Sequence, residues 1–169
     1  MVTSLKKTWS AIGASGIMNL TVVPFGNAKL SGDTVTCQHG PDECLGNSYE
    51  QCAIHLNPAT DAWFPYYECM EALGSRMIHK HSSVTCAGKA NLDNTAIEAC
   101  VNNPTLSLKL QKDAAANTGK HSYTPWVLVG GKISPSDGDK LLAEVCGKYK
   151  GSKPAACAKY AEPARCMMD

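Results

Sequence analysis

Nine cysteines in 169 residues constrain this sequence more than any other feature. Successive cysteines are 7, 8, 17, 17, 14, 46, 11 and 9 positions apart, so no two of them form a C-x-x-C pair. Such spacings favour structural disulfides over a reactive dithiol, and structural disulfides persist in oxidising compartments. Because nine is an odd number, at least one cysteine must be free, bridged to another chain or paired with a residue outside this sequence.

Zinc is the alternative use for the cysteines of residues 37–52. Cys37, Cys44 and Cys52, together with His39, offer soft ligands from one short segment. Their spacing does not match the paired C-x2-4-C pattern of zinc sites. We therefore expect no metal and no other cofactor, and we expect His39 to be a hydrogen-bonding residue that fixes its loop.

The chain is long enough for one domain with a substantial core. Hydrophobic residues make up 44% of it and charged residues 18%, which argues against disorder. No apolar run approaches the length of a membrane helix. The formal net charge of +1 provides no overall field for binding nucleic acid or an anionic membrane. We therefore predict a folded chain with no membrane span and no nucleic-acid partner.

The charge is unevenly distributed along the chain. Residues 31–75 contain no Lys or Arg but seven acidic residues, a local net charge of −7 that leaves +8 for the rest. One interpretation is a segment that meets a basic partner. The other is a solvated helical insertion balanced by the basic remainder of the same domain, and we adopt this second interpretation because it needs no partner.

Apolar periodicity and turn residues predict the order helix, strand, block of helices, hairpin and helix. The predicted helices cover residues 2–12, 41–52, 60–73, 91–101, 107–117 and 136–149, the predicted strand covers residues 17–25, and the predicted hairpin covers residues 126–133. Trp63, Tyr66 and Met70 recur at helical spacing, a stripe that is typical of a core. The tail after residue 151 is predicted to be irregular and to be held by its two cysteines.

The segment from Cys37 to Cys52 carries a resemblance to a known family. It reads CQHGPDECLGNSYEQC and resembles the C-Q-H-G-x-x-E-C-x-x-N-x-x-x-x-C signature of the gamma-interferon-inducible lysosomal thiol reductase family. The matching fixed places are Cys37, Gln38, His39, Gly40, Glu43, Cys44, Asn47 and Cys52. The flanking segments NLTVVPFGNA at 19–28 and YTPWVLVGGK at 123–132 also resemble the family's strands. The resemblance therefore covers essentially the whole chain.

The resemblance implies an α/β, thioredoxin-like fold. Residues 1–169 would form a single domain, and residues 37–119 would form a Cys-rich helical insertion that carries the signature. The implied activity is that of a thiol-disulfide oxidoreductase that reduces disulfide bonds of protein substrates in an acidic compartment. That chemistry needs a C-x-x-C pair at the start of a helix, where one thiolate attacks the substrate disulfide and the second thiol resolves the mixed disulfide.

This chain contains no such pair, so we expect no catalytic residue within it and no reductase turnover by it alone. The first strand and the C-x-x-C turn would lie upstream of Met1. Two explanations stay open: a shortened thiol reductase, or a natural chain that has lost its active-site strand and survives as a noncatalytic module. We favour the first, because the sequence starts within a predicted helix and has no secretion signal although its cysteines indicate an oxidising compartment. The functional alternative is a secreted, disulfide-stapled module that binds a peptide or protein.

Thr124 and Pro125 are the active-site element that the resemblance leaves in this chain. In thioredoxin-like enzymes a cis X-Pro bond stands beside the reactive cysteine, so we expect a cis Thr124-Pro125 bond whose backbone groups bind a substrate strand. Asn19 begins the one permitted N-x-S/T sequon, which makes it the candidate glycosylation site. For the complete protein, the resemblance implies the secretory pathway, with a lysosomal or vacuolar destination or secretion.

Overall fold

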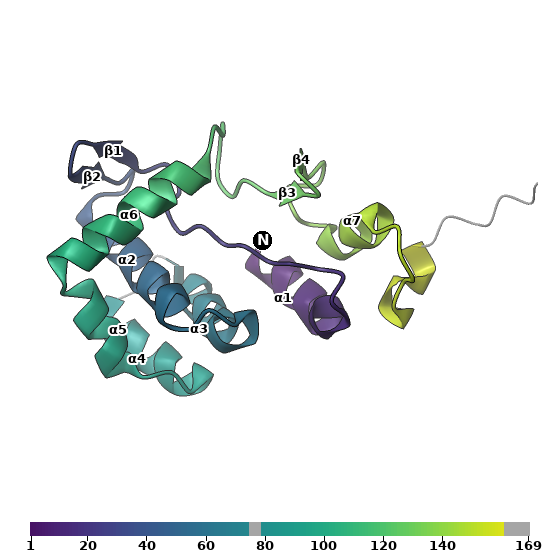
Figure 1. Ribbon diagram of the computed structural model, residues 1–169, viewed down its shortest axis with the longest axis horizontal. Coiled ribbons are helices and arrows are strands. Elements are labelled where there is room, and N and C mark those ends of the chain that lie inside the picture. Colours follow the sequence, from purple (N-terminus) through teal and green to yellow (C-terminus); the bar gives the residue numbers. More distant parts are fainter. Residues whose placement is uncertain (75–78, 161–169) are drawn as a thin grey trace, which may run out of the picture. The chain divides into compact units, whose positions relative to one another are not determined.

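The computed structural model describes residues 1–74 and 79–160, whose helices and strands are labelled in Figure 1. These residues are mostly helical, with two small antiparallel sheets and four disulfides. The chain divides into two compact units. One unit is Thr21–Thr124, and the other combines Met1–Leu20 with Pro125–Asp169. No described helix is both long and apolar enough to cross a membrane.

The unit Thr21–Thr124 consists, in its described part, of a β-hairpin and five helices. Its elements are β1 Lys29–Ser31, β2 Thr34–Thr36, α2 Pro41–Leu56, α3 Thr60–Leu73, α4 His79–Ala90, α5 Asn94–Val101 and α6 Pro104–Thr118. In the hairpin Leu30 pairs with Val35 in antiparallel register. Asp33 of the hairpin turn forms an exposed ion pair with Lys112 of α6 at 2.6 Å. Part of the acidic segment is thus balanced by a basic residue of the same unit.

Local sequence signals explain where three of these helices begin. Helices α2 and α6 start with proline, whose fixed φ and missing N–H suit the first helical position. The Asp93 carboxylate accepts the backbone N–H groups of Thr95 and Ala96 at 2.8 and 3.3 Å and caps α5. The Asn103 side chain caps α6 in the same way. These caps place the starts of α5 and α6 at residues 94 and 104, whereas apolar periodicity predicted residues 91 and 107.

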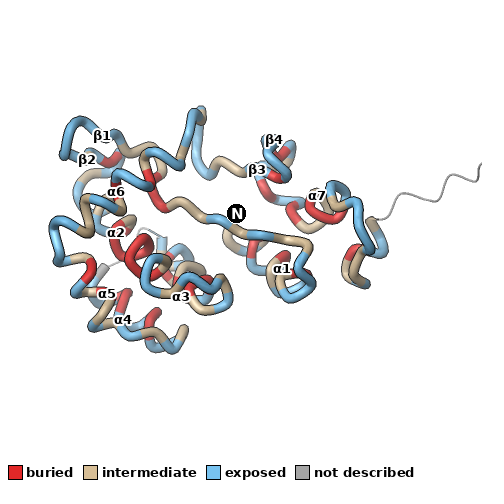
Figure 2. The backbone as a smooth tube through the Cα atoms, in the orientation of Figure 1, coloured by how far each residue is buried: buried red, intermediate tan, exposed pale blue. Residues whose placement is uncertain are grey.

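The core of this unit lies among helices α2 to α5, where Figure 2 shows buried stretches. The buried residues that form it are Tyr49, Cys52, Ala53, Tyr66, Met70, Cys86, Ala87, Ile97 and Cys100. One disulfide, Cys52–Cys100, links α2 to α5, and a second, between residues 69 and 86, links α3 to α4. The expectation that the cysteine spacings favour structural disulfides is confirmed for these four residues.

A line of hydrogen bonds joins α3, α4 and α5 through this core. The Tyr66 hydroxyl and the Ser83 hydroxyl lie 2.9 Å apart, and Ser83 Oγ donates to Asn94 Oδ1 at 2.7 Å. Asn94 Nδ2 in turn donates to Glu98 Oε1 at 3.0 Å. Because buried polar groups are costly unless they are paired, this line fixes the three helices against one another. The predicted stripe of α3 is confirmed as core, since Trp63, Tyr66 and Met70 are buried.

The other unit contains two helices, a second hairpin and two short 3-10 turns in its described part. Its elements are α1 Val2–Ile12, η1 Gly13–Ser15, β3 Leu128–Val129, β4 Lys132–Ile133, α7 Leu141–Lys148 and η3 Ala155–Tyr160. Leu5 and Ile12 of α1 are buried, and Ser4 Oγ donates to the Gly138 carbonyl oxygen at 2.6 Å. A disulfide, Cys146–Cys157, joins α7 to η3.

Three sequence predictions fall in this unit. The helix at 2–12 and the hairpin around the glycine turn at 130–131 are confirmed. The predicted helix 136–149 is shorter, because residues 135–140 form turns before α7 starts at Leu141. Ser136 closes those turns by accepting the Lys140 N–H at 2.9 Å. Cys157 holds the tail as predicted, whereas Cys166 lies outside the described residues.

The prediction of a buried strand at residues 17–25 is wrong. The described chain has no strand there, and residues 24–27 form a turn. A strand needs a partner strand for its backbone groups, whereas here side chains of α2 bind two carbonyl groups at the end of the segment. Gln51 Nε2 donates to the Pro24 carbonyl oxygen at 2.7 Å, and Asn47 Nδ2 donates to the Phe25 carbonyl oxygen at 3.3 Å. The end of the segment, at residues 24 and 25, is therefore bound to a helix and not to a sheet.

Candidate functional site: the signature loop at the start of helix α2

The eight fixed residues of the signature fall on the loop after β2 and along α2 as far as Cys52. Gly40 is the N-cap residue, with φ 91° and ψ −168°, a backbone conformation that is essentially restricted to glycine. Pro41 follows at the first helical position. The requirement for glycine at this place is therefore a requirement of the backbone, since no atom lies within 4 Å of the position where a Cβ would stand.

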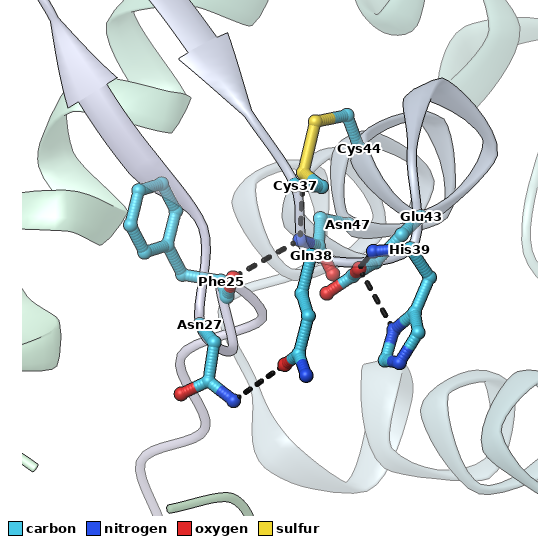
Figure 3. A network of polar contacts seen from close by, with 8 residues as sticks. All are labelled: Phe25, Asn27, Cys37, Gln38, His39, Glu43, Cys44 and Asn47. Carbon is cyan, nitrogen blue, oxygen red and sulfur yellow. Dashed lines mark hydrogen bonds and ion pairs between the residues drawn. A yellow bond between two sulfur atoms is a disulfide. The ribbon is translucent and has the colours of Figure 1, made fainter. Parts of the chain in front are cut away.

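A disulfide between Cys37 and Cys44 closes this loop against the helix (Figure 3). The two Cα atoms are 5.5 Å apart, a normal separation for a bridged pair. Cys37 is buried, and Cys44 is partly buried in the second turn of α2. The bridge holds the end of the loop, including the N-cap Gly40, against the start of α2.

Glu43, in the first turn of α2, binds the residue that precedes the N-cap. Its Oε2 accepts the backbone N–H of His39 at 2.6 Å and lies 3.1 Å from Nδ1 of the exposed His39 ring. In a capping box the glutamate at the third helical position binds the N–H of the N-cap residue, whereas Glu43 binds the N–H of the residue before it, because the Gly40 N–H donates to the Cys37 carbonyl oxygen. The negative charge of Glu43 also favours the helix N-terminus. The expected hydrogen-bonding role of His39 is therefore present in the structure.

The amides of the signature bind the turn at residues 24–27. Asn47 Nδ2 donates to the Phe25 carbonyl oxygen at 3.3 Å and lies 4.0 Å from Cys37 Sγ. Gln38 Oε1 accepts from Asn27 Nδ2 at 2.7 Å (Figure 3). Two side chains of the signature thus fix one short segment that precedes them by 11 to 22 positions in the chain.

Cys52 lies apart from the other seven signature residues, two turns further along α2 than Cys44. It is fully buried in the core, where it is bridged to Cys100 of α5. The structure therefore brings seven of the signature residues together around one helix start and uses the eighth to anchor the same helix to the core.

All eight cysteines in the described part of the chain are paired. Zinc binding by the signature would need thiolates, and its three cysteines are in disulfides. Among the described residues, no group of three or more His, Cys, Asp or Glu side chains is placed to hold a metal ion. Chemistry by a free thiol is likewise not available to those eight residues while their bridges are intact.

One buried acid in α2 has no motif to mark it in the sequence. Glu50 is 4% exposed, its Oε1 has no hydrogen-bond partner among the described residues, and its carboxyl group shares a hydrogen bond with that of Glu71 in α3. Burial raises the pKa of Glu50 well above that of an ordinary glutamate, and the negative charge of Glu71 raises it further. Glu50 therefore keeps its proton at pH values at which an exposed glutamate is ionised.

His121 is a second residue that sequence patterns did not mark. It follows α6 and contacts Asn27 through Nε2 at 3.0 Å, which attaches its segment to the turn held by Gln38. Thr124 and Pro125, the predicted substrate-binding residues, lie shortly after it in an exposed bend. Asn19, the predicted glycosylation site, is exposed.

The chain was compared with families and proteins of known name. A family model described as "Gamma interferon inducible lysosomal thiol reductase (GILT)" matches residues 1–104. The chain is 35% identical to the "Gamma-interferon-responsive lysosomal thiol protein" of Arabidopsis thaliana, over 83% of this chain and 61% of that protein. It is 34% identical to the "Gamma-interferon-inducible lysosomal thiol reductase" of Carassius auratus, over 86% of this chain and 61% of that protein. It is 32% identical to the Mus musculus protein of the same name, over 98% of this chain and 68% of that protein.

The disulfide-stapled helical unit with this signature at its central helix therefore has relatives in a plant, a fish and a mammal. The chain belongs to the gamma interferon inducible lysosomal thiol reductase family, as the signature predicted. It spans about three fifths of the length of the first two relatives.

Proposed function

We propose that this chain is the signature-bearing part of a thiol-disulfide oxidoreductase that reduces disulfide bonds of protein substrates. The observation that carries the proposal is the family membership, which rests on the match over residues 1–104 and on relatives named thiol reductases. The paired cysteines support the structural half of the proposal. They staple the signature helix and leave the redox step to other thiols.

The reaction itself needs two thiols three positions apart. One thiolate attacks a sulfur of the substrate disulfide, and the other thiol breaks the mixed disulfide, so that the substrate leaves with two thiols and the pair becomes a disulfide. An external thiol then returns the pair to its reduced form. Because these 169 residues hold no C-x-x-C pair, the pair has to be supplied in addition to them.

The finer parts of the proposal follow from the same family. Residues 1–169 belong to one thioredoxin-like domain with a helical insertion at 37–119, and Thr124 and Pro125 offer backbone groups to the substrate strand. The protein matures in the secretory pathway and acts in a lysosome or vacuole or outside the cell, which agrees with the presence of four disulfides in its described part. Exposed Asn19 is the glycosylation site.

Insulin reduction tests the proposal with three proteins. The first is this chain, the second carries an added upstream strand and C-x-x-C turn taken from a relative, and the third carries the same addition with both added cysteines changed to serine. We expect turnover above the thiol-reductant background from the second protein alone. Turnover by the chain itself, or none from the second protein when it is folded, would contradict the proposal.

A noncatalytic binding module is the second candidate, and the pairing of all eight described cysteines favours it. In that case this chain binds a reduced and alkylated insulin B chain by calorimetry, and the protein with the added C-x-x-C pair shows no turnover. Binding together with turnover by the second protein would instead assign the binding to a substrate step.

A further inference from the structure

The two units of the chain carry opposite net charges. Residues 21–124 contain seven basic and ten acidic residues, a net charge of −3, whereas the other unit contains nine basic and five acidic residues, a net charge of +4. The overall charge of +1 therefore hides a basic unit. Its excess is concentrated near the end of the chain, because residues 145–160 contain four lysines and no acid. We call Lys148, Lys150, Lys153 and Lys159 the lysine cluster.

A disulfide brings the lysine cluster together. Cys146 of α7 and Cys157 of η3 are bridged, with Cα atoms 5.3 Å apart, and Figure 1 shows η3 beside the end of α7. Lys148 and Lys159 each follow one of these cysteines by two positions, so each lysine Cα lies within about 7 Å of its cysteine. The other two lysines lie in the loop that the bridge closes. Charges at such separations act together, since the Debye length is about 10 Å at an ionic strength of about 0.1 M.

The lysine cluster is not neutralised by acids of the described chain. Three of its members are exposed and Lys153 is partly buried, and no described acidic side chain forms an ion pair with any of the four. By contrast, Lys109 and Lys112 of α6 each lie 2.6 Å from an aspartate oxygen. Lys148 stands in the last turn of α7, where a cation favours the helix dipole. That effect accounts for one lysine but not for four lysines without an acid.

An apolar pair lies on the hairpin that adjoins the lysine cluster. Leu128 of β3 pairs directly with Ile133 of β4, and the two residues are 55% and 53% exposed. Val129 lies on the opposite face of the hairpin and is buried, because strand side chains alternate between the two faces. Lys148 packs beside the hairpin turn, since its Cδ is 3.7 Å from the position that a Cβ of Gly130 would occupy. Uncompensated positive charge and exposed aliphatic side chains are therefore neighbours within one unit.

We propose that the lysine cluster and the Leu128–Ile133 pair form a docking surface for a membrane that contains anionic phospholipids. Such a membrane offers negative headgroups to the lysines and, at shallow depth, an apolar phase to the two aliphatic side chains. The contact is adsorption to the membrane surface and needs no spanning helix. This inference goes beyond the proposed function and does not depend on it.

An acidic protein segment is the other kind of partner that the lysine cluster attracts. The two partners differ in what they need from the chain. An acidic polypeptide such as polyglutamate binds through charge alone, whereas a membrane also takes up exposed aliphatic side chains. The apolar pair therefore favours the membrane, and the effect of substituting Leu128 separates the two partners.

Co-sedimentation of the intact chain with lipid vesicles measures the interaction. Vesicles of phosphatidylcholine are compared with vesicles in which one third of the lipid is phosphatidylserine. The ionic strength is about 0.01 M or about 1 M, where the Debye length is about 30 Å or about 3 Å. We expect binding to the anionic vesicles at the lower ionic strength only. Because each lysine near an anionic surface raises the partition coefficient about fivefold, the double variant Lys148→Gln, Lys150→Gln should lower it roughly 25-fold.

Two further variants complete the experiment. The double variant Lys109→Gln, Lys112→Gln is the matched control, because it removes the same charge from two exposed residues of α6, and it should keep the binding. Leu128→Thr keeps a residue that is favourable in strands and should lower the partition coefficient roughly tenfold by removing an aliphatic side chain. Far-UV circular dichroism verifies that each variant is folded.

Equal sedimentation with the two kinds of vesicle would overturn the inference. So would a loss of binding by the α6 control as large as the loss by the cluster variant, because net charge alone would then explain the binding. A partition coefficient unchanged by Leu128→Thr would also overturn it, and binding to soluble polyglutamate would then identify an acidic protein segment as the partner. No reductase activity enters these measurements, so they stand whether or not the proposed function does.

Discussion

Removing the bridge Cys52–Cys100 should destabilise the chain more than removing the bridge Cys37–Cys44. The perturbations are two double variants, in which both cysteines of one bridge become alanine. The bridged residues are 48 positions apart in the first pair and 7 in the second. The loop-closure relation then gives about 4 kcal/mol for the long bridge and about 2.4 kcal/mol for the short one.

Burial acts in the same direction as loop length. Cys52 and Cys100 both belong to the core cluster, so their truncation also removes packed sulfur atoms from between α2 and α5. Cys37 is buried and Cys44 partly buried, but neither belongs to the core cluster, and we expect the Glu43 bond to His39 and the Asn47 contact to form without the bridge. The difference of about 1.6 kcal/mol from loop closure is therefore a lower bound for the difference between the variants.

Urea unfolding, followed by far-UV circular dichroism, measures the free energy of unfolding of each double variant and of the natural chain. Peptide mapping under non-reducing conditions must first confirm that each variant keeps its other three bridges. The reasoning would be refuted if the variant without Cys37 and Cys44 lost as much free energy of unfolding as the variant without Cys52 and Cys100, or more. That result would mean that the hydrogen bonds of the signature loop depend on its bridge and do not form independently of it.

Three further predictions concern single residues. Because burial raises the pKa of Glu50, the folded chain binds this proton more tightly than the unfolded chain; the stabilisation is complete below the ordinary glutamate pKa of about 4.3 and is lost as the pH rises through the raised value. Glu50→Gln should therefore flatten the dependence of unfolding free energy on pH, and unchanged curves would contradict this. Gly40→Ala should cost about 1 to 3 kcal/mol through its backbone conformation, whereas Gly88→Ala, within α4 and with open space around it, should stabilise by about 0.5 to 1 kcal/mol. Tyr66→Phe should cost about 1 kcal/mol in the same urea assay by removing the bond to Ser83, and a silent change would show that this bond contributes nothing.

Strong local signals made part of the fold predictable. The predicted helix at 60–73 matches α3 at both ends, because a stripe of aromatic and apolar residues runs through it at helical spacing. Helix α4 was missed, because its sequence HKHSSVTCAGKA has no apolar stripe and contains residues of low helix propensity. Its disulfide to α3 and the Ser83 hydroxyl bond to Tyr66 hold it in place, and such tertiary contacts leave no periodic pattern.

The predicted strand at 17–25 shows a different limit. Its β-branched and apolar residues are those of a buried strand, and periodicity cannot tell whether a second strand stands beside it. At its end, Gln51 and Asn47 bind the carbonyl oxygens of residues 24 and 25. The signature residues were likewise located by spacing. Their partners Phe25 and Asn27 lie in the segment 19–28, whose resemblance to a strand of the family gave no indication of these contacts.

The Cys37–Cys44 bridge lies at a helix start that carries acidic side chains. In the proposed function the signature cysteines take no part in the redox step. Reactive cysteines stand at helix starts or beside cationic groups, where a thiolate is stabilised. The first turn of α2 carries two acidic residues, Asp42 and Glu43, and Glu43 already binds the preceding N–H group. At this helix start the two cysteines are joined in a disulfide, and the signature side chains Asn47 and Gln38 hold the turn at residues 24–27 and, through Asn27, contact the segment of His121.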